Sequence, residues 1–531
     1  MGMEQRYKPH DIAGYLAQGF LKNPLTALLG IFLLFIGYLA LVIMPREEDP
    51  QIAISGGTVI VAMPGASASE VEKIIVDPLE RKLREIKGIE HIYGMAMDNV
   101  GMVNVMYYIG ENREDSNLKL YDKVMQNLDL LPKGAMQPLV KPFDIDIDIP
   151  IVSVAFFVKD SNKTDDIAFY NTIKNIQQEI NSVENVSKTT LQGAKKPQYN
   201  IEVDLPKLSA YNISLGQVMQ GVSSMSVGVP EVKTPTQDGK IVVFGIENGI
   251  KDTDDIANIA IANYGGSLVY IRDIAKVTKG IDTQNFQEAK IRYRDSDDEP
   301  IKAEKRQTTL SVSKLAGTNA VVVAQDVLET IAKNEQMLHD AGIGYIVSRN
   351  YGIRANNAVN ELMHHLVITI IFIAVMLVFA LGWRESLIVT FTVPAILAIT
   401  LFIAYLSDQT INRITLFAFL LSLGLLVDAA IIVIENIHRH THSHNAHNQS
   451  MEELLVEATD EIGPPTNIAT LAIILTMVPM AFVGGMMGSF MKPIPLNVPV
   501  ALIASLVVAY IFTPYLALKL LSKGKEKGEK K

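Results

Sequence analysis

The stretch ITLFAFLLSLGLLVDAAIIVIENI (residues 414–437) is apolar over a length that can cross a membrane, yet it carries an acid near its middle. An ionised carboxylate in hydrocarbon costs at least ~2.5 kcal/mol, so an acid such as Asp428 usually serves a function there. Glu435 follows two helical turns later on the same face, and Gly424, one turn earlier, would let another helix approach closely. The stretch predicts a membrane span in which Asp428, and less directly Glu435, carries protons.

Both acids also have a plainer interpretation. Asp428 could be a structural residue that hydrogen-bonds to a neighbouring helix. Glu435 approaches the end of the run and could simply be solvated. The sequence by itself leaves these alternatives open.

Five other runs resemble this one in length and apolarity; they cover residues 25–44, 365–381, 387–406, 466–484 and 496–518. The first is too long for a signal-peptide core and has no small-residue cleavage site after it, so we expect it to stay. Lys8, Lys22, Arg384 and the lysine-rich tail fall on one side, which the positive-inside bias assigns to the cytoplasm. Six spans place both termini there and residues 45–363 outside.

The composition fits a protein with separate wet and lipid-facing regions, since 49% of residues are hydrophobic and 20% are charged. The formal charge of -10, with its only basic cluster in the tail, argues against nucleic-acid binding. The chain has no cysteine, which excludes disulfides and thiol chemistry. Residues 45–363 contain no nucleophile triad, metal triad or phosphate-binding loop. We therefore expect no enzyme activity and no cofactor.

The outer region alternates strand and helix patterns. The segment 58–63 has strand composition, residues 67–83 have helical spacing, and two strands meet at the turn around Asp98 and Asn99 before a helix near 117–131. A second copy of this order begins at Ile151, with strands at 186–193 and 198–204 and a helix at 208–225. Such βαββα units predict ferredoxin-like α+β modules.

Seven segments, in order along the chain, resemble those of resistance–nodulation–division (RND) exporters. LLVDAAIIVIENI (residues 425–437) is similar to the drug-exporter signature G-L-L-V-D-D-A-I-V-V-V-E-N of the fourth span. The others are KNPLTALL (22–29), MPREEDPQI (44–52), VAMPGASASEVEKIIVDPLE (61–80), WRESLIVTFTVP (383–394), PMAFVGGMMG (479–488) and FTPYLALKLL (512–521). The resemblance identifies an N-terminal half of an RND efflux transporter, of the multidrug or hydrophobe branch rather than the heavy-metal branch.

The resemblance implies a polytopic α-helical protein with six spans and a large extracytoplasmic domain of ferredoxin-like βαββαβ porter modules plus a docking subdomain. We expect a cytoplasmic N-terminus at 1–24 and the first span at 25–44. Porter subdomain 1 is expected at 45–135, and porter subdomain 2 at 136–195 and 286–345. The docking subdomain should occupy 196–285, spans two to six 364–519, and a basic tail 520–531.

Three departures from the family pattern bear on mechanism. Drug exporters often carry a second acid after the first, where this chain has Ala429, so Asp428 alone would fill the role of that pair. Fused exporters place a relay lysine in span ten, which this chain lacks, so the cationic partner of Asp428 is expected on another polypeptide. Gln192 stands where drug exporters tend to carry an aromatic pocket residue.

A histidine-rich segment follows the fourth span, with His438, His440, His442, His444 and His447. Such a density of imidazoles can bind zinc, nickel or copper. The plainer interpretation is a solvated cytoplasmic loop. We therefore expect no dedicated metal site and keep these histidines as the alternative.

The expected function is proton-driven export of hydrophobic or amphiphilic compounds from the periplasm or the outer leaflet of a bacterial inner membrane. The alternatives are a heavy-metal cation exporter of the same superfamily and a half-size accessory of protein translocation. Expected partners are a second RND half or further copies of this chain, as a trimer of halves or a hexamer-like assembly. A periplasmic adaptor, an outer-membrane channel, a small-molecule substrate and the bilayer complete the expected partners. The chain is either a separately encoded half or a piece of a longer protein.

Overall fold

The structure is a computed structural model that describes residues 7–52, 54–143, 148–160, 162–225, 229–235, 238, 240–246, 250–282, 287–294, 300–442 and 450–528. Among these residues, six helical segments are long and apolar enough to cross a membrane. They are α2 (Leu25–Ile43), α14 (Tyr351–Ala380), α15 (Trp383–Leu406), α16 (Arg413–Thr441), α17 (Met451–Ala481) and α18–α19 (Gly485–Met491 and Pro493–Gly528). The expectation of six spans is confirmed.

Two of these helices begin well before the apolar runs. The helix α14 starts at Tyr351 rather than at residue 365, and Asn350 caps it by accepting from the backbone N–H of Ile353. The helix α17 starts at Met451 rather than at 466, and Ser450 caps it. Hydropathy identifies only the apolar part of a helix. It therefore does not detect the polar first turns of α14 and α17.

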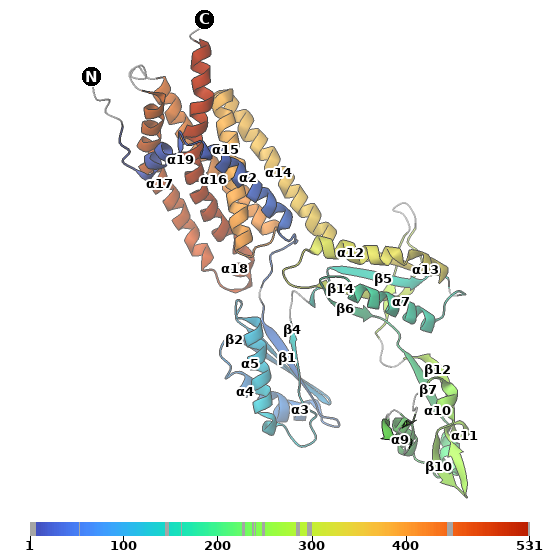
Figure 1. The fold of residues 1–531 in the computed structure, drawn as a ribbon. Helices are drawn as coiled ribbons and strands as arrows, with labels where there is room; N and C mark the ends of the chain where they lie inside the picture. The colour runs from blue at the N-terminus through green and yellow to red at the C-terminus, as the bar shows by residue number, and fades with distance from the viewer. Residues whose placement is uncertain are drawn as a thin grey trace.

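The helices form one bundle, with α16 packed against α19, α17 and α15 (Figure 1). A short helix, α1 (Ile12–Phe20), precedes α2 and packs on α17 and α19. The outer face of α15 contacts α2, where Gly37 lies so close to Ala398 that a Cβ at position 37 would overlap it. The α1 helix and the C-terminal part of α19 lie at the end of the bundle away from the sheets (Figure 1).

The first outer unit is a four-stranded antiparallel sheet in the order β2-β3-β1-β4. Its strands are β1 (Gly56–Ala62), β2 (Ile89–Met97), β3 (Val100–Tyr107) and β4 (Leu139–Phe143). One face is covered by α3 (Ala68–Val71), a π-helical turn (Glu72–Val76), α4 (Asp77–Leu83) and α5 (Arg113–Gln126); a 3-10 turn (Leu128–Leu130) follows. This is the ferredoxin-like order, and its fourth strand lies beyond the boundary expected at residue 135.

The second outer unit is also ferredoxin-like, but its strands come from two distant parts of the chain. The sheet pairs β15-β5-β14-β6, and β13 extends β14 at one end. The bounds are β5 (Val152–Val158), β6 (Val186–Gln192), β13 (Ala289–Ile291), β14 (Lys305–Lys314) and β15 (Ile343–Asn350). Its core lies against α7 (Asp166–Asn181), α12 (Ala320–Lys333) and α13 (Glu335–Asp340).

The pattern-based expectation that residues 198–204 supply the third strand of this module is wrong. That strand, β7 (Pro197–Val203), pairs instead with β12 (Ala275–Ile281), while β14 takes the place between β5 and β6. Both candidates have strand composition. Which one pairs with β6 depends on the return of the chain after residue 281, which no local pattern records.

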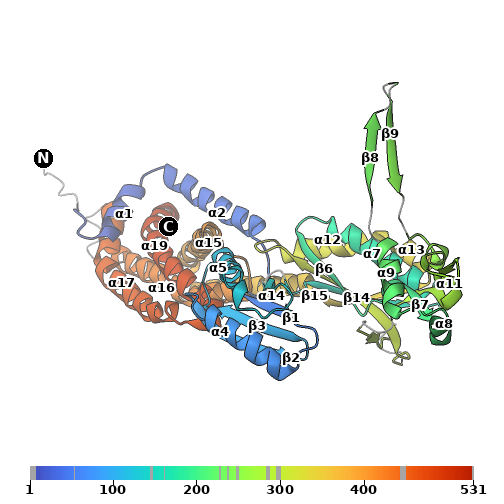
Figure 2. The same cartoon turned by 90° about the horizontal axis from the view of Figure 1, so that it is seen from below.

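Between β7 and β12 the chain forms a smaller outer unit. It contains α8 (Leu205–Ala210), α9 (Leu215–Met225), α10 (Thr253–Ala257), β10 (Ala260–Tyr264), β11 (Ser267–Tyr270) and α11 (Ile271–Ile274). The strands β8 (Val229–Pro235) and β9 (Ile241–Ile246) pair as a hairpin that projects far from the rest of the chain (Figure 2).

A cluster of charges joins the outer units to the bundle just after α2. Lys314, at the end of β14, donates to a carboxylate oxygen of Glu47 at 2.5 Å, and both side chains are almost fully buried (7% and 6% exposed). The other oxygen of Glu47 has no hydrogen-bond partner among the residues that the structure describes. The next residue, Glu48, pairs with Arg354 of α14 and Arg413 of α16. The exit of the first span is therefore tied to the second outer sheet and to two other helices.

Removing Lys314 should destabilise the chain, because it leaves a buried carboxylate without its cation. We expect Lys314→Met to lower the free energy of unfolding by about 3–5 kcal/mol, and the added change Glu47→Gln to recover most of that loss. Thermal unfolding of the purified chain measures both. The control Lys82→Met removes an exposed pair with Glu85 and should leave the transition unchanged. Equal effects of both lysine variants would contradict the buried pair's role.

Candidate functional site

The helix α16 starts at a strong cap, because the side chain of Asn412 accepts from the N–H groups of Ile414 and Thr415. Most of its apolar side chains are buried against the other helices. One stripe, however, faces away from the bundle, and its members are three or four residues apart. It consists of Phe417, Leu421, Gly424, Asp428, Ile432 and Glu435. The carboxylates of Asp428 and Glu435 thus share one open face, about 10.5 Å apart along the axis.

Asp428 is exposed on the surface of this chain, so the chain by itself does not cover its side chain. Within the described ranges the structure gives Asp428 and Glu435 no hydrogen bond or ion pair. A Cβ at Gly424 would have nothing within 4 Å, so no helix in the described part of the chain fills the space beside this glycine. The apolar run predicts how deep these residues lie in the membrane. Whether they face the bundle or its surroundings depends on how the other helices pack on α16.

The histidines after α16 do not converge on one point. The Nδ1 of His438 lies 3.5 Å from a carboxylate oxygen of Glu385 at the start of α15, and its ring stacks on that of His442 at 4.1 Å. His440 turns to α17, where its Nε2 lies 2.7 Å from Glu461. His444 and His447 lie outside the described residues. In the described part of the chain no group of three or more His, Asp or Glu side chains could hold a metal ion.

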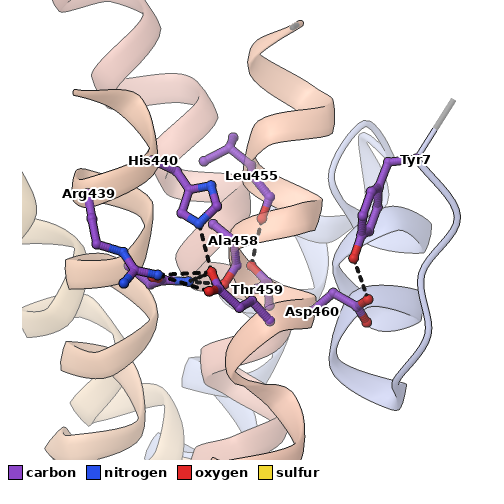
Figure 3. Close-up of polar contacts among 9 residues, drawn as sticks. Tyr7, Arg439, His440, Leu455, Ala458, Thr459 and Asp460 are labelled. Atoms are coloured by element: carbon purple, nitrogen blue, oxygen red, sulfur yellow. Dashed lines mark hydrogen bonds and ion pairs between the residues drawn. The ribbon is translucent and has the colours of Figure 1, made fainter. Parts of the chain in front are cut away.

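Two adjacent acids of α17, which the sequence reasoning missed, each accept several hydrogen bonds from other parts of the chain. Asp460 accepts from the hydroxyl of Tyr7 at 2.7 Å, and Glu461 accepts from the amide of Asn436 at 3.1 Å. Figure 3 shows Tyr7 beside Asp460 on one side of α17, and Arg439 and His440 on the other. Asp460 is only 4% exposed. The available signal was an acid pair, T-D-E-I, just before an apolar run.

Tyr7 is outside the spans and keeps its proton over the neutral range. Its burial, together with the hydrogen bond to the Asp460 carboxylate, raises the pKa of the Tyr7 hydroxyl above its usual value. Because the raised pKa belongs to the folded state, the stabilisation from Tyr7 is fully present below the ordinary tyrosine pKa of 10.0 and is lost only above it. The Tyr7 hydroxyl therefore donates to Asp460 at any pH near neutrality.

A cleft of about 580 Å³ opens where the second outer unit leads into the smaller one. It is lined by the start of α7, the turn at Gly193 and the first residues of β14. Lys195 and Arg306 both approach Asp166 there, at 3.3 and 4.0 Å. The aromatic rings of Phe169 and Tyr170 share the cleft with these charges. Gln192, the residue where drug exporters tend to have an aromatic side chain, directly precedes Gly193.

The sequence model of the AcrB/AcrD/AcrF family matches residues 16–531, which is nearly the whole chain. The chain belongs to this family. Its members are RND efflux transporters, so the resemblance drawn from the seven segments is confirmed. The match begins inside α1, so Tyr7 and the first residues of that helix precede it.

The chain is similar to several curated transporters over about half of their length. It is 25% identical to the toluene efflux pump membrane transporter TtgB of Pseudomonas putida over 97% of this chain and 48% of that protein. The same figures hold for the antibiotic efflux pump membrane transporter ArpB of Pseudomonas putida. It is 24% identical to an uncharacterised transporter of Haemophilus influenzae, over 94% of this chain and 47% of the relative. These family relatives and the six helices establish a multi-pass membrane protein.

Two glycines of the bundle should respond in opposite ways to the same substitution. Gly424→Leu places its side chain in open space and should leave the stability of the isolated chain within about 0.5 kcal/mol. Gly37→Leu drives a side chain into Ala398 of α15 and should cost about 1–3 kcal/mol. Thermal unfolding of the two variants in detergent compares them. A loss at Gly424 as large as that at Gly37 would mean that the open face of α16 is covered within this chain.

Proposed function

We propose that this chain is one half of a proton-driven efflux transporter in which Asp428 binds and releases the transported proton. The observation that carries the proposal is the open face of α16, where Asp428 has no partner among the described residues and Gly424 leaves room beside it. The match to the AcrB/AcrD/AcrF family and the named efflux pumps among the relatives support it.

An unpaired carboxylate facing lipid would be costly, by at least ~2.5 kcal/mol, so this face should be covered in the working transporter. Within the described residues, the other helices of the chain turn no cation toward it. We infer that a helix of a second half, or of another copy, packs on Gly424 and brings a cationic side chain to Asp428. The relatives are about twice as long as this chain, which favours a second half of similar size.

A proton-carrying acid should alternate between a paired, ionised state and a neutral, protonated one. Pairing with a cation favours the ionised form, and separation of the two helices in hydrocarbon favours the neutral form. A relative movement of α16 and its partner helix would therefore bind or release one proton. Glu435 lies two turns closer to the His438 end of α16, where a second carboxylate could pass protons to or from the cytoplasm.

We infer that the exported compounds are hydrophobic or amphiphilic. Two relatives are named for toluene and for antibiotics, and the cleft beside Gly193 combines two aromatic rings with charged side chains. The outer units then correspond to two porter subdomains and a docking subdomain, and the β8–β9 hairpin is the element that reaches a neighbouring protomer. A periplasmic adaptor and an outer-membrane channel are the proposed partners in a bacterial inner membrane.

The proposal predicts that Asp428→Asn abolishes export while the protein still folds, because asparagine keeps the shape of the side chain but cannot titrate. Ethidium efflux from cells that express the complete transporter measures the effect, and we expect it to fall to the level of cells without the transporter. The matched control is Asp408→Asn, in the exposed turn between α15 and α16, which should export normally. Export that survives Asp428→Asn would remove the proton role of this residue.

The same assay separates Glu435 from Asp428. If Glu435 passes protons between Asp428 and the cytoplasm, Glu435→Gln should slow ethidium efflux without abolishing it, because water can replace a carboxylate near the membrane surface. Full activity of this variant would show that Glu435 is a solvated surface residue.

A further inference from the structure

The turn of α17 that carries Asp460 and Glu461 contacts both the segment before the first span and the end of α16. Consecutive residues of a helix point about 100° apart, so two adjacent carboxylates can serve different neighbours. Asp460 faces the segment before the first span, which we call the arm (residues 7–20) (Figure 3). Glu461 accepts a hydrogen bond from Asn436 near the end of α16.

The arm supplies every hydrogen bond that the structure gives to the Asp460 carboxylate. Tyr7 donates its hydroxyl at 2.7 Å, and the backbone N–H groups of His10 and Asp11 donate at 2.9 and 2.8 Å. The Nδ1 of His10 lies 3.3 Å away as a fourth contact. A buried carboxylate without hydrogen-bond donors is strongly destabilised. Undocking the arm would therefore leave Asp460 without its donors, and this energetic cost favours the docked position of the arm.

A second set of contacts seats the arm against α17 and α19. The side chain of Asp11 caps α1 and also accepts from the amide of Asn467 at 3.0 Å. The carbonyl of the same Asn467 side chain accepts from the hydroxyl of Tyr510 in α19 at 2.9 Å. A Cβ at Gly14 would overlap Asp460, and one at Gly463 would overlap Asp11. The arm therefore lies in close contact with both helices and has little freedom to shift.

Glu461 fixes the last turns of α16 in the same way from the other side. Arg439 donates to both carboxylate oxygens at 3.0 Å, and the Nε2 of His440 lies 2.7 Å from one of them. Asn436, the residue after Glu435, donates to Glu461 and to the carbonyl of Ala458. A hydrogen-bonded helix behaves as a stiff rod, so the position of this end helps to set the position of Asp428.

We propose that Asp460 and Glu461 are positioning residues for the proton-carrying helix, and that the arm acts through them. Docking of the arm fixes the turn of α17, and the turn fixes the end of α16 on which the alignment of Asp428 with its partner depends. The first part of the arm precedes the residues that match the family. The inference rests on the proposed role of Asp428.

The seating of the arm can be measured directly, because the chain has no cysteine and a single introduced thiol is unique. Ala17→Cys places that thiol on the fully buried face of α1, where a maleimide should react slowly. Adding Asp460→Ala should speed the reaction about tenfold or more, since the arm loses its hydrogen bonds to a buried carboxylate. Gln18→Cys, on the exposed side of α1, should react fast in both backgrounds. An unchanged rate at position 17 would show that Asp460 does not hold the arm.

The effect on transport is tested with the complete transporter by the pH profile of ethidium efflux. We expect Asp460→Asn and Glu461→Gln each to move the midpoint of the profile by about half a pH unit or more, because a displaced α16 changes the surroundings of Asp428. A purely structural role would lower the amount of assembled transporter and leave the midpoint of the remaining activity in place. Glu453→Gln, on the same helix but outside these contacts, is the matched control.

The outcomes keep the two proposals apart. Export that persists in Asp428→Asn removes the proton role whatever the arm does. If Asp428→Asn abolishes export while Asp460→Asn and Glu461→Gln keep the parent midpoint, the proton role stands and the positioning role is overturned.

Discussion

A carboxylate halfway along a membrane-spanning helix, turned away from every described helix of its own chain, is the constraint that organises this protein. Hydrocarbon offers no water to solvate Asp428, so the energetic cost must be met by protonation or by a partner. Gly424 leaves the room that a partner helix needs beside the acid. Because the other described helices pack behind α16, this face is the exposed one.

The outer units obey a different constraint, because they fold in water around cores of their own. Each of the two ferredoxin-like sheets buries one face under helices. The buried Lys314–Glu47 pair is one of the contacts that tie them to the bundle. A buried ion pair contributes little net stability, but removal of only one of its two charges is strongly destabilising. The pair therefore specifies the arrangement in which the two regions join and adds little to the free energy of their association.

The opposite end of the bundle has its own ordered set of contacts. Asp460 and Glu461 are neighbours in sequence, yet they bind different parts of the chain. Asp460 accepts hydrogen bonds from the segment before the first span, and Glu461 accepts them from the end of the fourth span. The two ends of α16 are thus held by different chemistry: a capped start near the Glu48 cluster, and a charged, histidine-containing end against α17. Between them, Asp428 lies on a helix whose position is fixed at both termini.

The sequence by itself determined the six spans, the ferredoxin-like modules and the family, because apolar length, strand alternation and motif order are local or collinear properties. It also placed Asp428, Gly424 and Glu435 on one helical face, since that follows from the period of the helix. Only the tertiary structure decided that this face is open, that β14 rather than β7 completes the second sheet, and that Tyr7 meets Asp460. These depend on contacts between residues hundreds of positions apart, and such contacts are set by how the elements pack, which no single stretch of sequence encodes.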